Sequence, residues 1–269
     1  MAFAVHQGVR IHYRVVGKGP PLILHHGFTQ TIKRWYLCGY VEALRNDYTL
    51  ILVDPRGHGR SDKPHDPIAY ALPTRVADVV AVLDALAIER ATFWGYSDGG
   101  RIAFGLAKYS PERISSLIIG GHDPYERRIP PAARDVCTDS NAFVDALLRR
   151  INIDPTMVTP ARREELLAND FHALAAALQD MPSIEEVLPE MHMPCLLYAG
   201  ELDRFYPDIL RCSRLMPNVT VVGLANLNHS GTFWASNDVV SHVTAFLSRA
   251  LPSPEALPGH ATMPAGIRG

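Results

Sequence analysis

A serine between two glycines predicts nucleophilic chemistry in this chain. The segment G-Y-S-D-G at 95–99 has the pattern G-x-S-x-G, and it joins an apolar run to residues at helical spacing, such as Ile102 and Leu106. A tight turn between a strand and a helix exposes the serine hydroxyl at the end of the strand, near the N-terminus of the helix. We therefore predict that Ser97 is a nucleophile rather than a serine in an ordinary glycine-rich turn.

A serine hydroxyl needs a base, and the base needs an acid that orients it. We predict that His229 is the base, because it is the only histidine between the last expected strand and the closing helix. For the acid we prefer Asp203, which lies beyond a glycine turn after an apolar strand, to Glu201 within that turn. Asp123 follows another strand and is the rival acid.

Acyl transfer also needs backbone N–H groups that stabilise the developing oxyanion. We predict that the N–H groups of Asp98 and Phe28 do this, the latter in H-H-G-F at 25–28, where Gly27 lets the backbone approach the substrate. The side chains of Phe28 and Trp234 are expected to line the substrate pocket, which favours an apolar acyl or alcohol group. The carboxylate of Asp98 has no role in this scheme, and it would repel acidic substrates if it faced the pocket.

These residues must be positioned by strands that alternate with helices. Apolar runs predict strands at 22–24, 49–53, 91–96, 114–119, 194–199 and 219–222, and the alternating stretch 9–16 predicts a strand with one solvent-exposed face near an edge of the sheet. Apolar residues at helical spacing predict a helix at 74–87 capped by Thr74, one after Ser97, and a closing helix around 239–247. Strands that are apolar on both faces are typical of a parallel sheet covered on both sides, so the expected fold class is α/β.

The alternation of strands and helices breaks between 123 and 190. Helical patterns at 141–151 and, as a longer segment, at 161–179 predict a helical block over the carboxyl edge of the sheet, where open α/β sheets bind ligands. The expected organisation is a core of residues 1–122 and 191–250, a helical cap of residues 123–190, and a flexible tail of residues 251–269.

The composition narrows the class of protein. Only 20% of the 269 residues are charged and the formal net charge is −2, so a nucleic acid is not an expected partner. The N-terminal residues lack the pattern of a signal peptide, no apolar run is long enough to span a membrane, and the four cysteines fit no zinc template. We expect a cytoplasmic protein that binds a small molecule and no metal, nucleic acid or membrane.

Four motifs together resemble those of the α/β-hydrolase superfamily. They are H-H-G-F at 25–28, D-P-R-G-H-G-R-S-D-K-P at 54–64, G-Y-S-D-G-G at 95–100, and G-E-L-D at 200–203 paired with N-H-S-G at 228–231. The resemblance implies a twisted, mostly parallel sheet of about eight strands, a helical cap after the sixth strand, and no cofactor. It also implies a catalytic triad of Ser97, Asp203 and His229 in a carboxylic ester hydrolase, an esterase or lactonase.

Other activities share these residues. A cofactor-free haloperoxidase or perhydrolase and a carbon–carbon bond hydrolase use the same triad, and both stay open as alternatives. G-R-S-D-K-P at 59–64 is also similar to dehalogenases and epoxide hydrolases, but these need a carboxylate nucleophile where this chain has Ser97. Some members of the superfamily lack the triad and only bind ligands, which the presence of all three residues argues against.

Overall fold

A computed structural model describes residues 2–130, 140–150 and 154–250, and in it one sheet has the strand order β1-β2-β4-β3-β5-β6-β7-β8. The strands are Ala2–His6 (β1), Val9–Gly17 (β2), Pro21–His25 (β3), Thr49–Val53 (β4), Ala91–Tyr96 (β5), Ile114–Gly120 (β6), Cys195–Gly200 (β7) and Val219–Leu224 (β8). β2 runs antiparallel to both of its neighbours, and the other strands pair in parallel. The predicted α/β class with about eight strands is confirmed.

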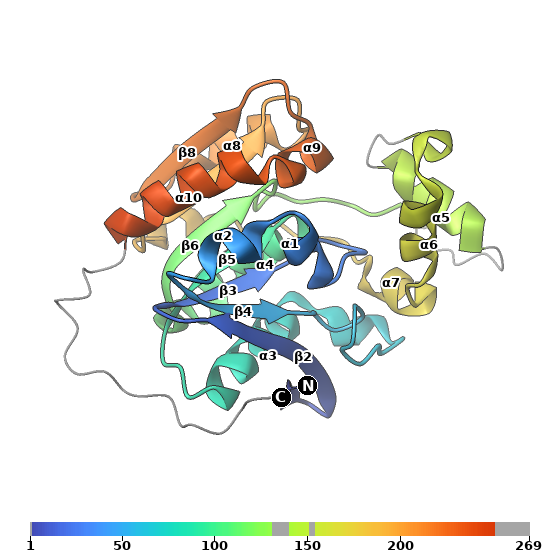
Figure 1. Ribbon diagram of the computed structural model, residues 1–269, viewed down its shortest axis with the longest axis horizontal. Helices are drawn as coiled ribbons and strands as arrows, with labels where there is room; N and C mark the ends of the chain where they lie inside the picture. Colours follow the sequence, from blue (N-terminus) through green and yellow to red (C-terminus); the bar gives the residue numbers. More distant parts are fainter. Residues whose placement is uncertain (1, 131–139, 151–153, 251–269) are drawn as a thin grey trace.

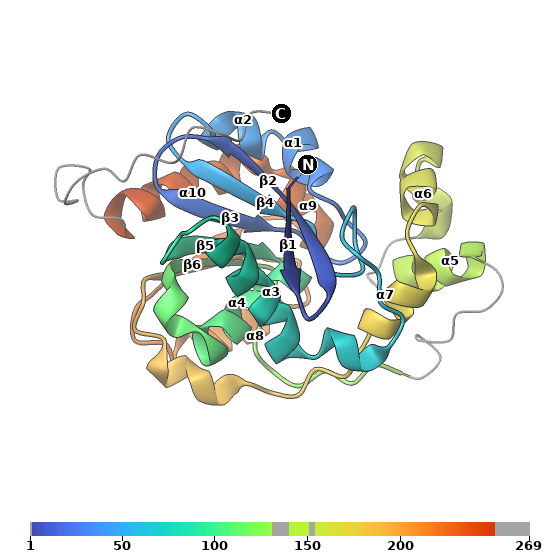
Figure 2. The ribbon, with the colours of Figure 1, turned by 90° about the horizontal axis from the view of Figure 1, so that it is seen from below.

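Helices cover both faces of the sheet (Figures 1 and 2). One face packs against α1 (Lys33–Leu37), α2 (Tyr40–Leu44), α9 (His229–Trp234) and α10 (Ser236–Ala250), and the other against α3 (Leu72–Ala85), α4 (Asp98–Tyr109) and α8 (Tyr206–Ser213). Successive residues of a strand point to opposite faces, so Phe93 of β5 lies in one hydrophobic cluster and Trp94 in the other. This two-sided burial explains why the sequence of β5 is apolar throughout.

The chain leaves the sheet between β6 and β7. It forms α5 (Ser140–Arg150), α6 (Pro160–Leu167) and α7 (Phe171–Ala177), with short 3-10 helices at Pro155–Met157 (η4) and Glu185–Glu190 (η5). In Figures 1 and 2, α5, α6 and α7 lie to one side of the sheet. The longer helical segment expected at 161–179 is two helices, because Asp170 caps α7 by accepting a hydrogen bond from the N–H of Ala173.

Some elements differ from the expectation. β1 was not predicted, and it forms a hairpin with β2 through a turn with positive φ at Gln7 and Gly8. The short helices α1 and α2 were not predicted either, nor were the 3-10 helices Pro67–Tyr70 (η1) and Pro111–Arg113 (η2). Thr74 was the wrong cap, because α3 begins at Leu72 with Pro73 in its first turn, which places Thr74 inside the helix.

Within its described part, the chain has no helix that is both long enough and apolar enough to span a membrane. Cys38, Cys195 and Cys212 are buried as free thiols. The fourth cysteine, Cys137, and the predicted flexible tail at 251–269 lie outside the described residues.

Candidate active site

Ser97 lies on a sharp turn between β5 and α4. Its φ of 56° and ψ of −114° are rare for a residue other than glycine. The turn also brings backbone segments very close together: a Cβ at position 95 would collide with the backbone of Gly99, and one at position 99 would collide with the carbonyl of His25. Glycines at these two positions therefore allow the turn that presents the serine hydroxyl.

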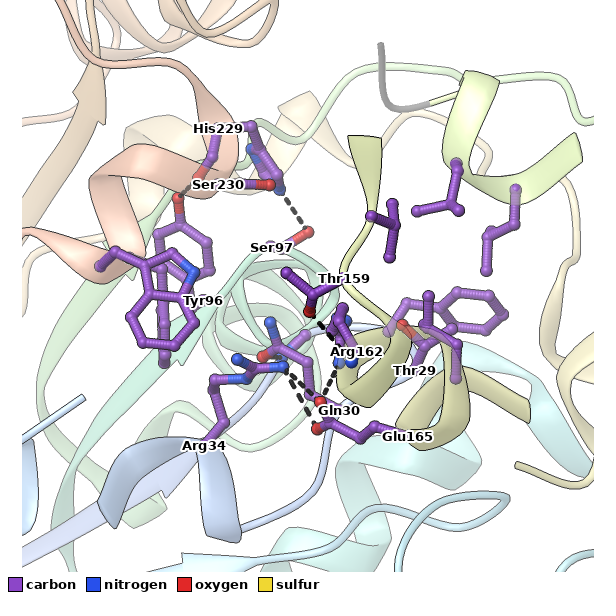
Figure 3. A pocket seen from close by; sticks show the side chains of 18 of the residues that line it. Thr29, Gln30, Arg34, Tyr96, Ser97, Thr159, Arg162, Glu165, His229 and Ser230 are labelled. Carbon is purple, nitrogen blue, oxygen red and sulfur yellow. Dashed lines mark hydrogen bonds and ion pairs between the residues drawn. The ribbon is translucent and has the colours of Figure 1, made fainter. Parts of the chain in front are cut away.

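A serine, a histidine and an aspartate form a hydrogen-bonded chain at the carboxyl ends of the parallel strands. His229 Nε2 lies 2.9 Å from Ser97 Oγ, and His229 Nδ1 lies 2.7 Å from Asp203 Oδ2 (Figure 3 shows the first of these). A carboxylate can only accept, so Nδ1 of the neutral ring carries the proton and Nε2 accepts the hydrogen of the serine hydroxyl. This arrangement can remove the proton of Ser97 while its oxygen attacks an electrophile.

The two partners of the serine are held in place by their surroundings. Asp203 is buried, and its Oδ1 accepts a hydrogen bond of 3.1 Å from the N–H of Phe205. The hydroxyl of Tyr96 donates to the carbonyl of His229. The imidazole packs between the rings of Tyr96 and Phe205, with centroid distances of 5.4 and 5.3 Å. The ring is therefore oriented before any substrate arrives.

The rival acid, Asp123, is engaged with other partners. Its Oδ1 accepts a 3.0 Å hydrogen bond from the N–H of Tyr125, and its Oδ2 pairs with Arg127. Burial raises the pKa of Asp123, although Arg127 opposes the shift. Glu201 is exposed on its turn. The structure therefore brings Asp203, and neither of these two, to the histidine.

Two backbone N–H groups beside the serine are available to a bound molecule. Neither the N–H of Phe28 nor that of Asp98 donates a hydrogen bond to another described residue. Asp98 is the first residue of α4, and the loop before Phe28 is close enough that a Cβ on Gly27 would lie 3.1 Å from Cβ of Ser97. Both groups can therefore donate to an oxygen of a molecule bound at the serine.

The side chain of Asp98 does not line the pocket beside Ser97 but forms a buried ion pair with Arg75. One bond, from Nη1 to Oδ1, is 3.1 Å long, and a second joins Nη2 to Oδ2. Burial by itself would raise the pKa of Asp98, but the attraction of Arg75 outweighs it and holds the pKa well below its usual value. This carboxylate is therefore not a source of repulsion for acidic substrates.

Asp54 ties the loop that carries Phe28 to the loop that follows β4. Its carboxylate accepts from two backbone N–H groups and lies within hydrogen-bond distance of two imidazoles. These partners are Ile32 N at 2.9 Å, Arg60 N at 3.2 Å, His12 Nδ1 at 2.8 Å and His26 Nε2 at 3.3 Å. With four partners around one buried carboxylate, the loop has a defined position.

A pocket of about 520 Å³ opens beside Ser97, between the ends of the strands and the α5–α6 segment (Figure 3). Phe28 and Trp234, the two predicted pocket residues, both line it, and Trp234 is 56% exposed at its rim. No pattern in the sequence pointed to the large apolar residues that line the pocket from α5, α6 and the segment between them, Leu147, Leu148, Met157, Val158 and Leu166. No group of three or more His, Cys, Asp or Glu side chains in the described part of the chain could hold a metal ion.

Charged side chains that no sequence pattern indicated line another part of this pocket. They are Arg34 from α1 and Arg162 and Glu165 from α6 (Figure 3). Glu165 Oε2 lies 3.0 Å from Arg34 Nη2 and 2.6 Å from Arg162 Nη1. The charged run R-R-E-E at 162–165 indicates only a polar helix face, and no signal in the sequence links it to Arg34.

Comparisons with known proteins agree with this architecture. Residues 20–157 match the family model described as the alpha/beta hydrolase fold. The chain is 27% identical over 282 residues to a cis-3-alkyl-4-alkyloxetan-2-one decarboxylase of Shewanella oneidensis, with 91% of this chain and 87% of the relative covered. Among solved structures it is similar to Est816, an N-acyl homoserine lactone degrading enzyme, at 27% identity and a TM-score of 0.72, covering 91% of this chain and 100% of Est816. It is also similar to the esterase RhEst1 of Rhodococcus sp., at 26% identity and a TM-score of 0.77, covering 92% and 98%.

Proposed function

The chain belongs to the α/β hydrolase fold family, and from this premise we propose that it cleaves a carboxylic ester or lactone through an acyl-enzyme on Ser97. The observation that carries the proposal is the hydrogen-bonded chain from Ser97 through His229 to Asp203 beside a pocket. The similar structures RhEst1, an esterase, and Est816, an N-acyl homoserine lactone degrading enzyme, support the same class of substrate.

In the proposed reaction, Ser97 Oγ attacks the carbonyl carbon while His229 Nε2 takes its proton. Asp203 stabilises the imidazolium that forms, and the N–H groups of Phe28 and Asp98 donate to the tetrahedral oxyanion. The imidazolium then protonates the leaving alcohol, which departs and leaves an ester on Ser97. Water, deprotonated by the same imidazole, hydrolyses this acyl-enzyme and restores the serine.

We also propose that residues 123–190 act as a cap that completes the substrate site. The support is that residues of α5 and α6 line the pocket together with residues from the ends of the strands. Leu148 and Leu166, whose buried side chains belong to one small cluster, give the cap its own apolar packing. An apolar part of the substrate would lie against this side of the pocket.

The test is hydrolysis of p-nitrophenyl butyrate, followed by the release of nitrophenol, together with labelling by a fluorophosphonate detected by mass spectrometry. We expect Ser97→Ala to lower kcat by about 10³-fold or more and to abolish labelling. Ser230→Ala is the matched control, because Ser230 lines the same pocket without a hydrogen bond to His229 in the described structure. Unchanged activity in Ser97→Ala, or a wild-type protein that is neither labelled nor active on any ester or lactone, would contradict the proposal.

The alternative activities differ in the acceptor or in the bond that is broken. A perhydrolase would transfer the acyl group of Ser97 to peroxide, and a carbon–carbon bond hydrolase would release a carbon acid instead of an alcohol. Product analysis with an ester in the presence and absence of peroxide, and with a vinylogous diketone, separates these activities from ester hydrolysis. We expect the ester to be the better substrate.

A further inference from the structure

The pocket beside Ser97 has a positively charged end. Among the described residues that line it, the side chains with a permanent charge are Arg34, Arg162 and Glu165. Two guanidinium groups thus face one carboxylate, which leaves a net positive charge in a concave, partly apolar site. In such a site a charge has fewer water molecules to screen it, so it attracts an anion more strongly than on an open surface.

Arg34 is buried, but its hydrogen bonds use only part of its guanidinium group. Its side chain is only 5% exposed, and its guanidinium lies over the ring of Trp234 at 5.1 Å from the centroid. Both of its hydrogen bonds to Glu165 use Nη2, while its Nε is buried and has no hydrogen-bond partner in the described structure. A buried N–H without an acceptor is costly, and a small rotation of the guanidinium toward the pocket would let a ligand oxygen accept from it.

Arg162 is also incompletely satisfied. Its Nη1 lies 2.6 Å from Glu165 Oε2, but the N–H bonds do not point at this oxygen, so the contact is an ion pair without a hydrogen bond. Burial lowers the pKa of Arg34, and the positive charge of Arg162 lowers it further, while Glu165 only partly offsets them. The two arginines therefore repel each other across a single shared carboxylate, and a second negative charge would relieve that repulsion.

We propose that this end of the pocket binds a free carboxylate of the substrate, and that the enzyme therefore prefers esters or lactones that carry one. The inference rests on the proposed function, because it names the substrate class of the same site. Guanidinium groups bind carboxylates through paired N–H donors. The substrate carbonyl would lie at Ser97, its apolar part against the leucines of α5 and α6, and its carboxylate at Arg34 and Arg162.

The test compares two esters of the same length, mono-p-nitrophenyl adipate and p-nitrophenyl hexanoate, which differ in the terminal carboxylate. We expect the wild-type kcat/KM to favour the adipate ester by about 10- to 100-fold, with most of the difference in KM. Arg34→Gln and Arg162→Gln should each reduce this preference by about tenfold or more. Lys33→Gln is the matched control, because it removes the same charge from an exposed position of the same helix as Arg34.

A second variant separates recognition from structural support. Glu165→Gln removes the carboxylate that competes for the arginines, so it should keep or increase the preference for the adipate ester, whereas a cluster that only supports the fold would lose activity on both esters. An equal kcat/KM for the two esters in the wild type, or a preference that both arginine variants leave unchanged, would overturn the inference.

A binding measurement keeps the inference distinct from the proposed function. Ser97→Ala is titrated calorimetrically with monoethyl adipate and with ethyl hexanoate. If the wild type is neither labelled by the fluorophosphonate nor active on any ester or lactone, the proposed function fails, and tighter binding of monoethyl adipate still supports the carboxylate site. Equal affinity for the two compounds overturns it.

Discussion

Three buried histidines make the stability of this fold depend on pH. His25 is the last residue of β3, His58 packs against Phe28 with ring centroids 5.5 Å apart, and the ring of His122 lies 5.2 Å from that of Phe205. Burial disfavours the charged imidazole, and it lowers the pKa of His25 to about 3, that of His58 to about 4, and that of His122 well below its usual value. At mildly acidic pH, all three rings are neutral in the folded protein.

The direction of the effect follows from proton binding. In the unfolded chain each of these histidines takes up a proton near pH 6.5, so below that pH the unfolded state binds more protons and the free energy of unfolding falls. At pH 5.5 each histidine lowers it by about 1.4 kcal/mol, and the three together by about 4 kcal/mol. Asp54 and Asp98 do not act in this window, because their pKa values are lowered from 3.8 and the stability that they contribute is lost only at lower pH.

The assay is urea unfolding at pH 7.5, 6.5 and 5.5, followed by the fluorescence of the buried residues Trp35 and Trp94. The free energy of unfolding should fall by about 4 kcal/mol between pH 7.5 and 5.5, a large part of the 5–15 kcal/mol typical of a domain. His58→Gln should reduce the change by about a third, and His192→Gln, at an exposed position, should leave it unaltered. A free energy that stays constant across this range would refute the reasoning.

Four further substitutions, with one control, test the site and its surroundings. Asp203→Asn should lower kcat for ester hydrolysis by about 10³- to 10⁴-fold, and Asp123→Asn far less; steady-state kinetics of both variants decides between the two acids, and a larger loss at Asp123 reverses the assignment. Asp98→Asn leaves its buried arginine partner without a counter-charge, so denaturant unfolding should show a loss of about 3–5 kcal/mol; a loss below about 1 kcal/mol would show that the pair is unimportant. Gly121→Ala adds a Cβ only 3.0 Å from the ring of the site histidine at a φ of +59°, and kcat should fall by about tenfold. Gly8→Ala, with φ +76° and no atom within 4 Å, is its control for backbone strain, and equal kcat in both variants would contradict the role of the close contact.

The parts of the site that depend on local sequence could be predicted. The turn at Ser97 is specified by its own glycines and by the strand and helix on either side. The positions of Asp203 and His229 follow from the topology, because loops after neighbouring parallel strands meet at one edge of the sheet. The existence of the sheet could be predicted for the same reason, since its central strands are apolar throughout.

The parts that depend on contacts between distant segments could not be predicted. The partner of Asp98 is an arginine on α3, and the partner of Glu165 is Arg34 on α1, 131 residues away. Neither contact leaves a periodic signal, because each needs the packing of two helices whose relative position is set by the whole sheet. The five-residue helices α1 and α2 were missed since they are too short to show a helical period.

The carboxylate of Asp54 limits the motion of the loop that carries Phe28. The backbone N–H groups of Ile32 and Arg60 both donate to this one side chain, so neither amide hydrogen can exchange with solvent until its hydrogen bond to Asp54 breaks. The two loops should therefore open as one cooperative unit. The Phe28 loop then loses its conformational entropy once, when the chain folds. It does not recur each time a substrate binds, and the loop acts as a fixed wall of the site rather than as a flap.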